Sequence, residues 1–455
     1  MTGVDRVSAA GDTEPTSSAV PPSAAMASAS PTSAAPATGA PAPEPRSGTR
    51  GNDGPLKGIM ITDFCWVGAG SYTTKMLADQ GADVIKIESN AKVDGIRLSA
   101  PFAGGKMGVN RSGYFADRNS SKRSCTINMK TEEGQRIARE LVVRSDVVAN
   151  NFTPGVMARF GLSYDDVRQI NPRAVYLAMS MQGESGPERD YLGYGLTISA
   201  IVGLHGMTAL PGQEPVGTGT NYPDHVPNPT HAAFAVLAAL RHARRTGRGQ
   251  MIDMAQTEAT ISVLGTAMME YGVNGRDREP IGNRHDRYAP HGVYLCSGDD
   301  RWIAIAVTTD DQFRALVDEL ELDAAAVDRS WDENVRRREH DALDAAISDR
   351  ARHLDRDALA ERLQAAGIPA GPVQDPRDVV DRDPQLAARG HWVRLDHAEM
   401  GRTLYNALPF RLSRTPTEIT VPAPMLGEHT VEVCSDVLGM DPDEIQRLID
   451  EEVLH

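Results

Sequence analysis

The sequence has few cysteines, few aromatic residues, no long hydrophobic run and fewer basic than acidic side chains. Its four cysteines lie far apart and form no Cys-x-x-Cys pair, which argues against a zinc site or a disulfide framework and fits a reducing cytoplasm. No apolar stretch approaches the length that spans a bilayer. The formal net charge of -15 argues against a nucleic-acid partner or an anionic membrane, because both attract basic surfaces. A small anionic ligand in a local basic pocket remains compatible with this charge.

The start of the chain differs in composition from the rest. Residues 1–54 are rich in Ala, Pro, Ser and Thr and contain almost no large apolar side chains. Such a segment cannot bury enough apolar surface to offset the entropy lost on ordering. It also lacks the basic start and continuous apolar block of a secretory signal. We therefore expect a disordered tail, to which no function is assigned.

Helix and strand patterns alternate after this tail. The stretch "LKGIMITDF" predicts a short buried strand, and "SYTTKMLADQGADVIKIE" predicts a helix, a turn at Gly81 and a second strand. The same succession returns in "EEGQRIARELVVRSDVVANNF" and in "YDDVRQINPRAVYLAMS". Three helix–strand units by about residue 180 predict an α/β fold with a Rossmann-like large domain.

The amino-acid composition changes near residue 275, where the segment "NGRDREPIGNRHDRYAP" is polar and contains glycine, as a linker does. After it, "RWIAIAV" predicts a strand, and amphipathic helical stretches follow to about residue 365. We expect a large domain over residues 55–250, a linker helix and loop over 251–284, a small α+β domain over 285–395, and a C-terminal return to the large domain over 396–455.

One acidic residue stands out in "GTGTNYPDHVPNPTHAAFAVLAAL". Asp224 directly follows Pro223 and precedes an apolar helix that should run from about residue 230 to 245 and end at Gly247. Asp and Pro both favour turns, so a turn or capping role is the simplest interpretation of Asp224 taken alone. A chemical role needs support from the rest of the chain.

Basic residues near Gly-containing turns suggest an anionic ligand. The nucleotide fingerprint GxGxxG is absent, but "VGAGSYTTKML" is a strand-to-helix turn whose free backbone N–H groups could receive a phosphate. Lys122, Arg123, Lys130 and Arg159 could add phosphate contacts, because Arg grips oxygen pairs and Lys acts as a point charge. For any one of these residues taken alone, a solvated surface position is the favoured interpretation. Together they make an anionic nucleotide ligand as reasonable as a solvated surface.

Five segments together resemble the family III CoA-transferases, which include carnitine CoA-transferase, formyl-CoA transferase and the bile-acid-inducible F proteins. These segments are "ITDFCWVGAGSYTTKMLADQGADVIKIE", "NSSKRSCTINMKTEEG", "NNFTPGVMARFGLSYDDVRQINPRAVYLAMS", "HAAFAVLAALRHARRTGRGQMIDMAQTEA" and "PMLGEHTVEVCSDVLGM". The resemblance extends over about residues 55–440. It implies a cytoplasmic enzyme that acts on acyl-CoA and carboxylic acid substrates, with no metal or redox cofactor, since CoA enters as part of the substrate. It also implies a homodimer of interlocked chains, against the usual unthreaded topology.

The resemblance assigns roles to individual residues. Asp224 falls where these enzymes hold their nucleophilic aspartate, although one extra residue separates it from His231. A carboxylate there can attack a thioester carbonyl to form a mixed anhydride, which CoA then converts to an aspartyl-CoA thioester. The family's CoA contacts map to Val67, Ala69, Ile127, Lys130, Asn151, Phe152, Val156 and Arg159. Further candidates for the substrate pocket are Gly68, Tyr194, His225 and Arg284.

Departures from the family pattern bear on the substrates. Gly68 replaces a glutamine of formyl-CoA transferase, Ser89 replaces an arginine near the adenosine, and the flexible run of glycines is missing. An oxalate/formate substrate pair is therefore disfavoured, and the sequence identifies no other acid.

Two alternative functions stay open. The α-methylacyl-CoA racemases of the same family use an Asp at the position of Gly195 and an upstream His, which is absent around residues 164–166. Glycine cannot move a proton, so this chemistry is disfavoured. The chain could also be a CoA-binding partner subunit of a heteromeric transferase, although its retained Asp224 argues against that role.

Overall fold

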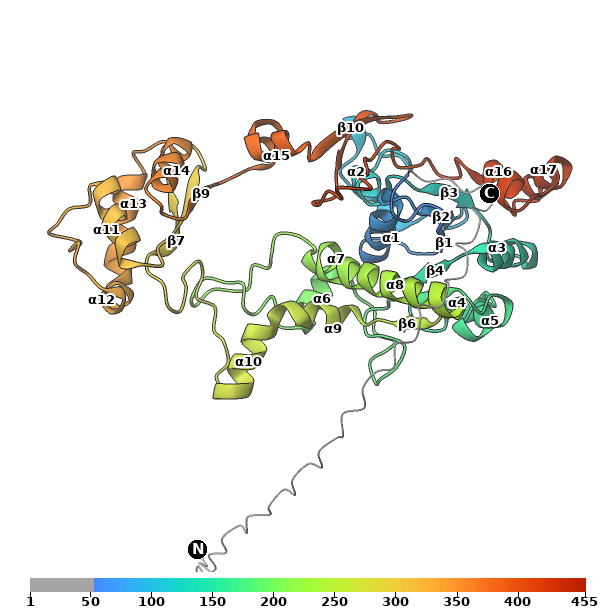
Figure 1. The fold of residues 1–455 in the computed structure, drawn as a ribbon, viewed down its shortest axis with the longest axis horizontal. Coiled ribbons are helices and arrows are strands. Elements are labelled where there is room, and N and C mark those ends of the chain that lie inside the picture. The colour runs from blue at the N-terminus through green and yellow to red at the C-terminus, as the bar shows by residue number, and fades with distance from the viewer. Residues whose placement is uncertain (1–52) are drawn as a thin grey trace, which may run out of the picture. The chain divides into compact units, whose positions relative to one another are not determined.

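The computed structural model describes residues 53–455 (Figure 1). The tail predicted over residues 1–54 therefore lies outside the described residues, except for its last two positions. Within the described part of the chain, no helix is both long and apolar enough to cross a membrane.

A six-stranded parallel sheet forms the centre of the large domain, with strand order β3-β2-β1-β4-β5-β6 (Figure 1). The chain order reverses between β1 and β4, which makes this the topological switch point where ligands bind in such sheets. The predicted α/β, Rossmann-like fold is confirmed. The strands are β1 (Met60–Asp63), β2 (Asp83–Glu88), β3 (Arg123–Thr126), β4 (Val147–Asn150), β5 (Val175–Ala178) and β6 (Met251–Asp253).

Helices cover both faces of this sheet. Met60 packs into one buried apolar cluster and Ile61 into another, because successive side chains of a strand point to opposite faces. The first cluster includes side chains from α3 (Glu132–Arg144), α5 (Tyr164–Ile170) and the C-terminal α17 (Pro442–Asp450). The second includes side chains from α1 (Ala69–Asp79) and α8 (Pro227–Thr246).

Helix α8 is the helix predicted after Asp224. It ends at Gly247, which adopts a left-handed conformation, as predicted. It begins at Pro227, three residues before the predicted start, because proline fits the first position of a helix.

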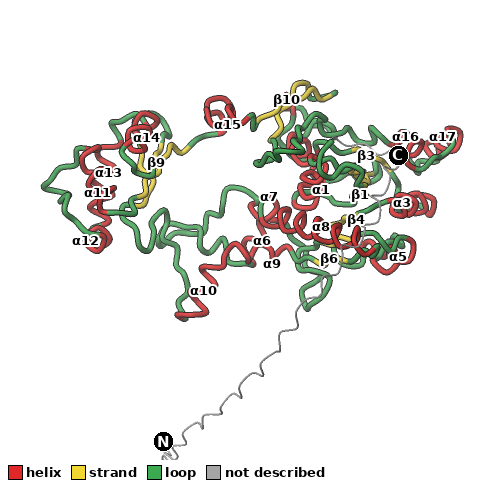
Figure 2. Tube along the Cα trace, in the orientation of Figure 1, coloured by secondary structure: helices red, strands yellow, loops and turns green. Residues whose placement is uncertain are grey.

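The connections around α8 carry much irregular backbone. Long loops join β5 to α8 (Figure 2), interrupted by α6 (Gly195–Ile201) and by α7 (Tyr222–His225). The other elements of the large domain are η1 (Gly95–Leu98), η2 (Ala103–Gly105), α2 (Gly113–Asn119), α4 (Val156–Arg159), α9 (Gln256–Ile261), η3 (Ser262–Leu264) and α10 (Gly265–Asn274).

The small domain is built on an antiparallel sheet with strand order β7-β8-β9. Its own apolar core joins Ile303 and Ile305 of the central strand to Phe313, Leu343 and Leu363 of the helices. The predicted α+β character is present. Its elements are β7 (His291–Leu295), β8 (Trp302–Ala306), α11 (Asp310–Leu320), α12 (Glu333–Arg338), α13 (His340–Ala351), α14 (Arg356–Ala365) and β9 (Ala370–Val373).

The C-terminal part follows η4 (Asp378–Arg382) and α15 (Pro384–Arg389). Strands β10 (Trp392–His397) and β11 (Gly401–Asn406) form an antiparallel hairpin, so the boundary predicted between residues 395 and 396 falls inside a strand. Tyr405 of this hairpin packs with Phe115 of α2 in one buried cluster. The last elements, α16 (Thr430–Glu432), η5 (Val433–Val437) and α17, return to the large sheet.

Candidate active site

A cavity of about 880 Å³ lies where the parallel strands end. Residues that directly follow β1, β2, β3 and β4 line it, together with Tyr194 at the start of α6 and Asp224 of α7. Carboxyl ends of parallel strands meet at one edge of a sheet, and this edge is where α/β proteins place their ligands. The cavity therefore sits at the position that the topology favours.

The cavity gathers the predicted CoA contacts. All eight residues proposed for this role line its wall: Val67, Ala69, Ile127, Lys130, Asn151, Phe152, Val156 and Arg159. Gly68 and Tyr194, candidates for the substrate pocket, line it as well. The predicted CoA contacts thus come from the segments after three different strands, β1, β3 and β4, and line one space, although 92 positions separate Val67 from Arg159.

Lys92 is a cavity residue that the sequence reasoning missed. Its ammonium lies 5.5 Å from the ring centroid of Trp66, whose ring in turn meets Phe152 edge-on at 5.7 Å. Lys92 comes three residues after Ser89, the position where the family arginine is missing. The available signal was its place four residues after the end of β2, at the edge of a parallel sheet where ligands bind.

Lys122 and Arg123 do not line the cavity. The Lys122 ammonium is buried and lies 3.1 Å from Asp63 Oδ2, and it also donates to Thr74 Oγ1 at 2.7 Å. The Arg123 guanidinium pairs with Asp83 of the neighbouring strand. These two charged groups bind side chains of the sheet and of α1. The prediction that they contact a phosphate is therefore wrong.

Asp224 is buried at the cavity wall, with 4% of its surface exposed. Its Oδ2 accepts a hydrogen bond at 3.2 Å from the backbone N–H of Gly195. Burial raises the pKa of this carboxyl to about 6, although the Gly195 N–H and the charge of Arg118 both act to lower it. At neutral pH the side chain is an anion that is more basic than an exposed aspartate.

Two glycines press against this carboxylate. A Cβ added to Gly68 would lie 2.9 Å from Asp224 Cβ, and one added to Gly195 would lie 2.9 Å from Asp224 Oδ2. Both positions therefore bring bare backbone against the side chain. A larger residue at either position would displace Asp224, which gives a physical reason for the two departures noted from formyl-CoA transferase and from the racemases.

His225 and Arg284 lie outside the lining of this cavity. The His225 ring packs edge-on against Tyr114, with Nδ1 3.1 Å from Thr220 Oγ1, and burial lowers its pKa to about 4. The Arg284 guanidinium binds Asp341 and Asp344 of α13 at 2.6 and 2.7 Å. Its charge is therefore already paired in the small domain.

The described residues contain no group of three or more His, Cys, Asp or Glu side chains placed to hold a metal ion. The four cysteines are buried and unpaired by disulfides.

Comparison with known proteins gives a consistent match. The model of CoA-transferase family III matches residues 56–430. A succinyl-CoA–L-malate CoA-transferase beta subunit from Chloroflexus aurantiacus is 33% identical over 88% of this chain and 98% of its own. A succinate–glutarate CoA-transferase from Agrobacterium fabrum is 34% identical over 84% of this chain and 96% of its own. Among solved structures, a CAIB/BAIF family protein from Brucella suis has a TM-score of 0.77 at 31% identity, covering 84% of this chain and 99% of that protein.

Proposed function

Because the chain belongs to CoA-transferase family III, we propose that this enzyme moves CoA between carboxylic acids by covalent catalysis at Asp224. The observation that carries the proposal is the buried Asp224 carboxylate on the wall of the cavity that the candidate CoA contacts line. A local turn or capping role in its own segment does not account for it, because the carboxylate caps neither α7 nor α8 and instead binds the first N–H of α6, 29 positions away.

The chemistry proceeds in four acyl transfers. A carboxylate oxygen of Asp224 attacks the donor thioester carbonyl, the C–S bond breaks, and CoA leaves as a thiolate from a mixed anhydride. The thiolate then attacks the aspartyl carbonyl, which releases the donor acid and leaves an aspartyl-CoA thioester. The acceptor carboxylate attacks the same carbonyl, displaces the thiolate and forms a second anhydride. Finally the thiolate attacks the acceptor's acyl carbon, which yields the new acyl-CoA and the free Asp224 carboxylate.

No step requires net proton transfer, which suits the residues around the nucleophile. Gly195 offers a backbone N–H but no acid or base, and His225 stays neutral above about pH 4. A racemase would need a proton carrier at this place. Catalysis instead depends on holding the reacting groups close together and keeping water away from the anhydride and thioester.

We assign the phosphates of CoA to the three cationic residues of the cavity, Lys92, Lys130 and Arg159. Their charges offset those of the phosphates, and Arg159 can hold two oxygens in a fork. The rings of Trp66 and Phe152 meet edge-on on the same wall, and we assign the adenine ring to the flat apolar face of one of them.

For the acids, we propose that at least one is a short dicarboxylic acid. The two relatives described above carry names with succinate, malate or glutarate, and each is more than 30% identical over more than four-fifths of this chain. The proposal concerns the substrate class alone.

We further propose that two copies of this chain associate. Helix α10 has no buried residue, although it carries Met268, Met269, Tyr271 and Val273 with 43–70% of their surfaces exposed. A second chain covering this helix would remove that apolar surface from water. One relative is the beta subunit of its enzyme, so the native mass of the purified single chain decides between a homodimer and a heteromer.

The function is tested by transfer from succinyl-CoA and from acetyl-CoA to a panel of mono- and dicarboxylic acids, with each new acyl-CoA identified by mass. We expect transfer by the purified chain and none by Asp224→Ala. Equal activity in Asp224→Ala would overturn the covalent role. Transfer from acetyl-CoA to monocarboxylic acids, with no transfer from succinyl-CoA and none to any dicarboxylic acid, would overturn the substrate class. Lack of transfer by the single chain, restored by a partner subunit, would favour the heteromeric alternative.

A further inference from the structure

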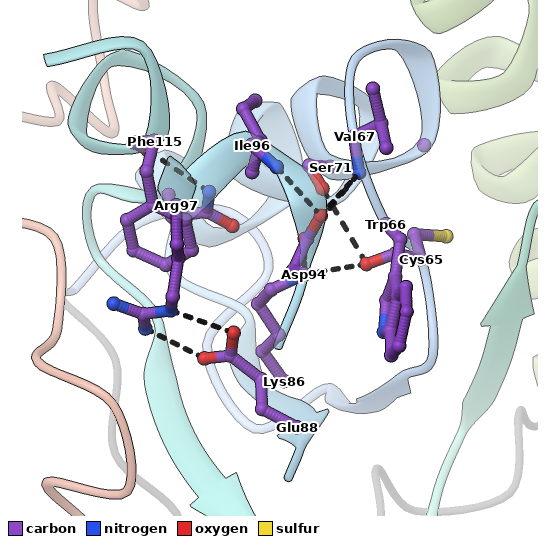
Figure 3. Close-up of polar contacts among 12 residues, drawn as sticks. Cys65, Trp66, Val67, Ser71, Lys86, Glu88, Asp94, Ile96, Arg97 and Phe115 are labelled. Carbon is purple, nitrogen blue, oxygen red and sulfur yellow. Dashed lines mark hydrogen bonds and ion pairs between the residues drawn. The ribbon is translucent and has the colours of Figure 1, made fainter. Parts of the chain in front are cut away.

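The turn between β1 and α1, part of which is drawn in Figure 3, is held in an uncommon conformation. Val67 has a φ of 60°, in the left-handed region that β-branched residues rarely adopt. The next residue is Gly68, whose backbone lies against the Asp224 side chain. Such a conformation persists only where the surroundings determine it, and it is often part of an active site.

A buried side chain from another segment fixes this conformation. Asp94, at the start of η1, accepts the backbone N–H of Val67 with Oδ1 at 3.1 Å and that of Ile96 at 3.2 Å (Figure 3). Its other oxygen lies 3.0 Å from the Lys86 ammonium, and both side chains are completely buried. Lys86 also donates to the carbonyl of Cys65 at 2.5 Å. The ion pair thus holds the backbone on both sides of Trp66.

The peptide between Trp66 and Val67 has a second contact, at its carbonyl end. The Asn151 amide binds both the N–H and the carbonyl of Trp66, at 2.8 and 2.7 Å. The only side-chain hydrogen bond to the Val67 backbone in the described chain comes from Asp94. Asp94 therefore holds the N–H end of the peptide that precedes Val67, and the orientation of this peptide helps to set the φ of Val67.

We propose that Asp94 is a positioning residue for the reaction at Asp224. It holds Val67 in the left-handed conformation, and this keeps the Gly68 backbone against the nucleophile. Asp94 itself does not line the cavity, so it acts through these two residues. The proposal rests on Asp224 as the nucleophile, and it adds a dependence of the reaction on a residue 130 positions away in the sequence.

The alternative is that Asp94 only stabilises the fold as the counter-ion of Lys86. A double-mutant cycle separates the two roles, because glycine adopts a positive φ readily and needs no side chain to hold it there. We expect Asp94→Ala to lower kcat about 10- to 100-fold, with a smaller change in KM for the acyl-CoA. In a Val67→Gly background the same substitution should lower kcat by about threefold or less.

Asp94→Asn and Asp79→Ala are the matched variants. Asparagine keeps an oxygen for the Val67 N–H, so kcat should stay within about threefold of wild type even if the lost ion pair lowers Tm. Asp79 forms an equally buried pair with Lys75 at the far end of α1. Asp79→Ala should therefore lower Tm. It should not cause a loss of kcat that becomes smaller in the Val67→Gly background, as Asp94→Ala should.

Several outcomes overturn the proposal. These are equal loss of kcat from Asp94→Ala in both backgrounds, a loss in Asp94→Asn as large as in Asp94→Ala, and failure of Asp94→Ala to fold in both backgrounds. Folding only in the Val67→Gly background would support it. Full activity of Asp224→Ala would contradict the proposed function itself. If instead Asp224→Ala is inactive and Asp94→Ala is fully active, only the positioning role of Asp94 is rejected.

Discussion

The backbone N–H of Gly195 donates a hydrogen bond to Asp224 Oδ2 at 3.2 Å, across 29 positions of sequence. By resemblance, the racemases of this family carry their acid at this position, which in this chain is bare backbone bound to the proposed nucleophile. A Cβ at residue 195 would stand 2.9 Å from that oxygen. A side chain at residue 195 and the Asp224 carboxylate therefore cannot both occupy this space. In this chain the Asp224 carboxylate occupies it.

The space requirement predicts the effect of adding one methyl group. Gly68→Ala and Gly195→Ala should each lower kcat about 10-fold or more, because the new Cβ displaces the Asp224 side chain. Gly371→Ala in β9 is the control, since its Cβ would meet no atom within 4 Å and its φ is not positive. Steady-state kinetics of the three variants decide the matter, and unchanged kcat in both test variants would show that the contact is not required.

Burial of Asp224 predicts a gain in stability when its charge is removed. Burial raises the folded-state pKa from 3.8 to about 6, so between these values the folded state binds more protons and stability falls as the pH rises. Asp224→Asn should thus increase the free energy of unfolding at pH 7.5 by about 1–3 kcal/mol. The gain should shrink toward pH 5. Urea unfolding at the two pH values measures it, and a less stable variant at pH 7.5 would contradict the cause given.

The same shift predicts the acid limb of the pH profile. Attack requires the Asp224 carboxylate, so kcat/KM should fall as the pH drops below about 6. The positive charge of Arg118 lowers the pKa of Asp224, so Arg118→Met should move the midpoint to higher pH, while Arg118→Lys should leave it nearly in place. A midpoint near 4 in the wild type would mean that burial does not control this group.

The position of Lys92 predicts a binding defect. Lys92→Ala should raise KM for the acyl-CoA about 3- to 10-fold with little change in kcat, since a phosphate contact acts equally in the ground state and the transition state. Lys57→Ala removes an exposed lysine that does not line the cavity and serves as control. An unchanged KM in Lys92→Ala would remove Lys92 from the CoA site.

The sequence allowed the α/β fold and one cluster of site residues to be predicted, for identifiable reasons. Strands such as β1 are buried on both faces, so they lack the alternation of apolar and polar residues, and "GIMI" at its start is an apolar run. The family resemblance identified eight residues that line the cavity. These residues follow the ends of strands, which lie at one edge of the sheet.

Side-chain pairings across the chain could not be predicted in this way. Strand β3 was missed because Arg123 reads as a surface charge until its partner Asp83 is placed on the neighbouring strand. The Val67–Asp94 bond joins residues 27 positions apart, and no local pattern announces a valine with positive φ. The domain boundary predicted between residues 395 and 396 falls inside β10 of the β10–β11 hairpin, where charged residues alternate with apolar ones.

The central claim is that Asp224 becomes covalently bound during turnover. The most direct measurement incubates the purified chain with succinyl-CoA without acceptor, treats it with hydroxylamine or borohydride, and determines the mass of the peptide that contains Asp224. We predict a hydroxamate or a reduced side chain at Asp224, and no modification of that peptide in Asp224→Ala. An unmodified Asp224 peptide from an enzyme that transfers CoA under the same conditions would contradict the account.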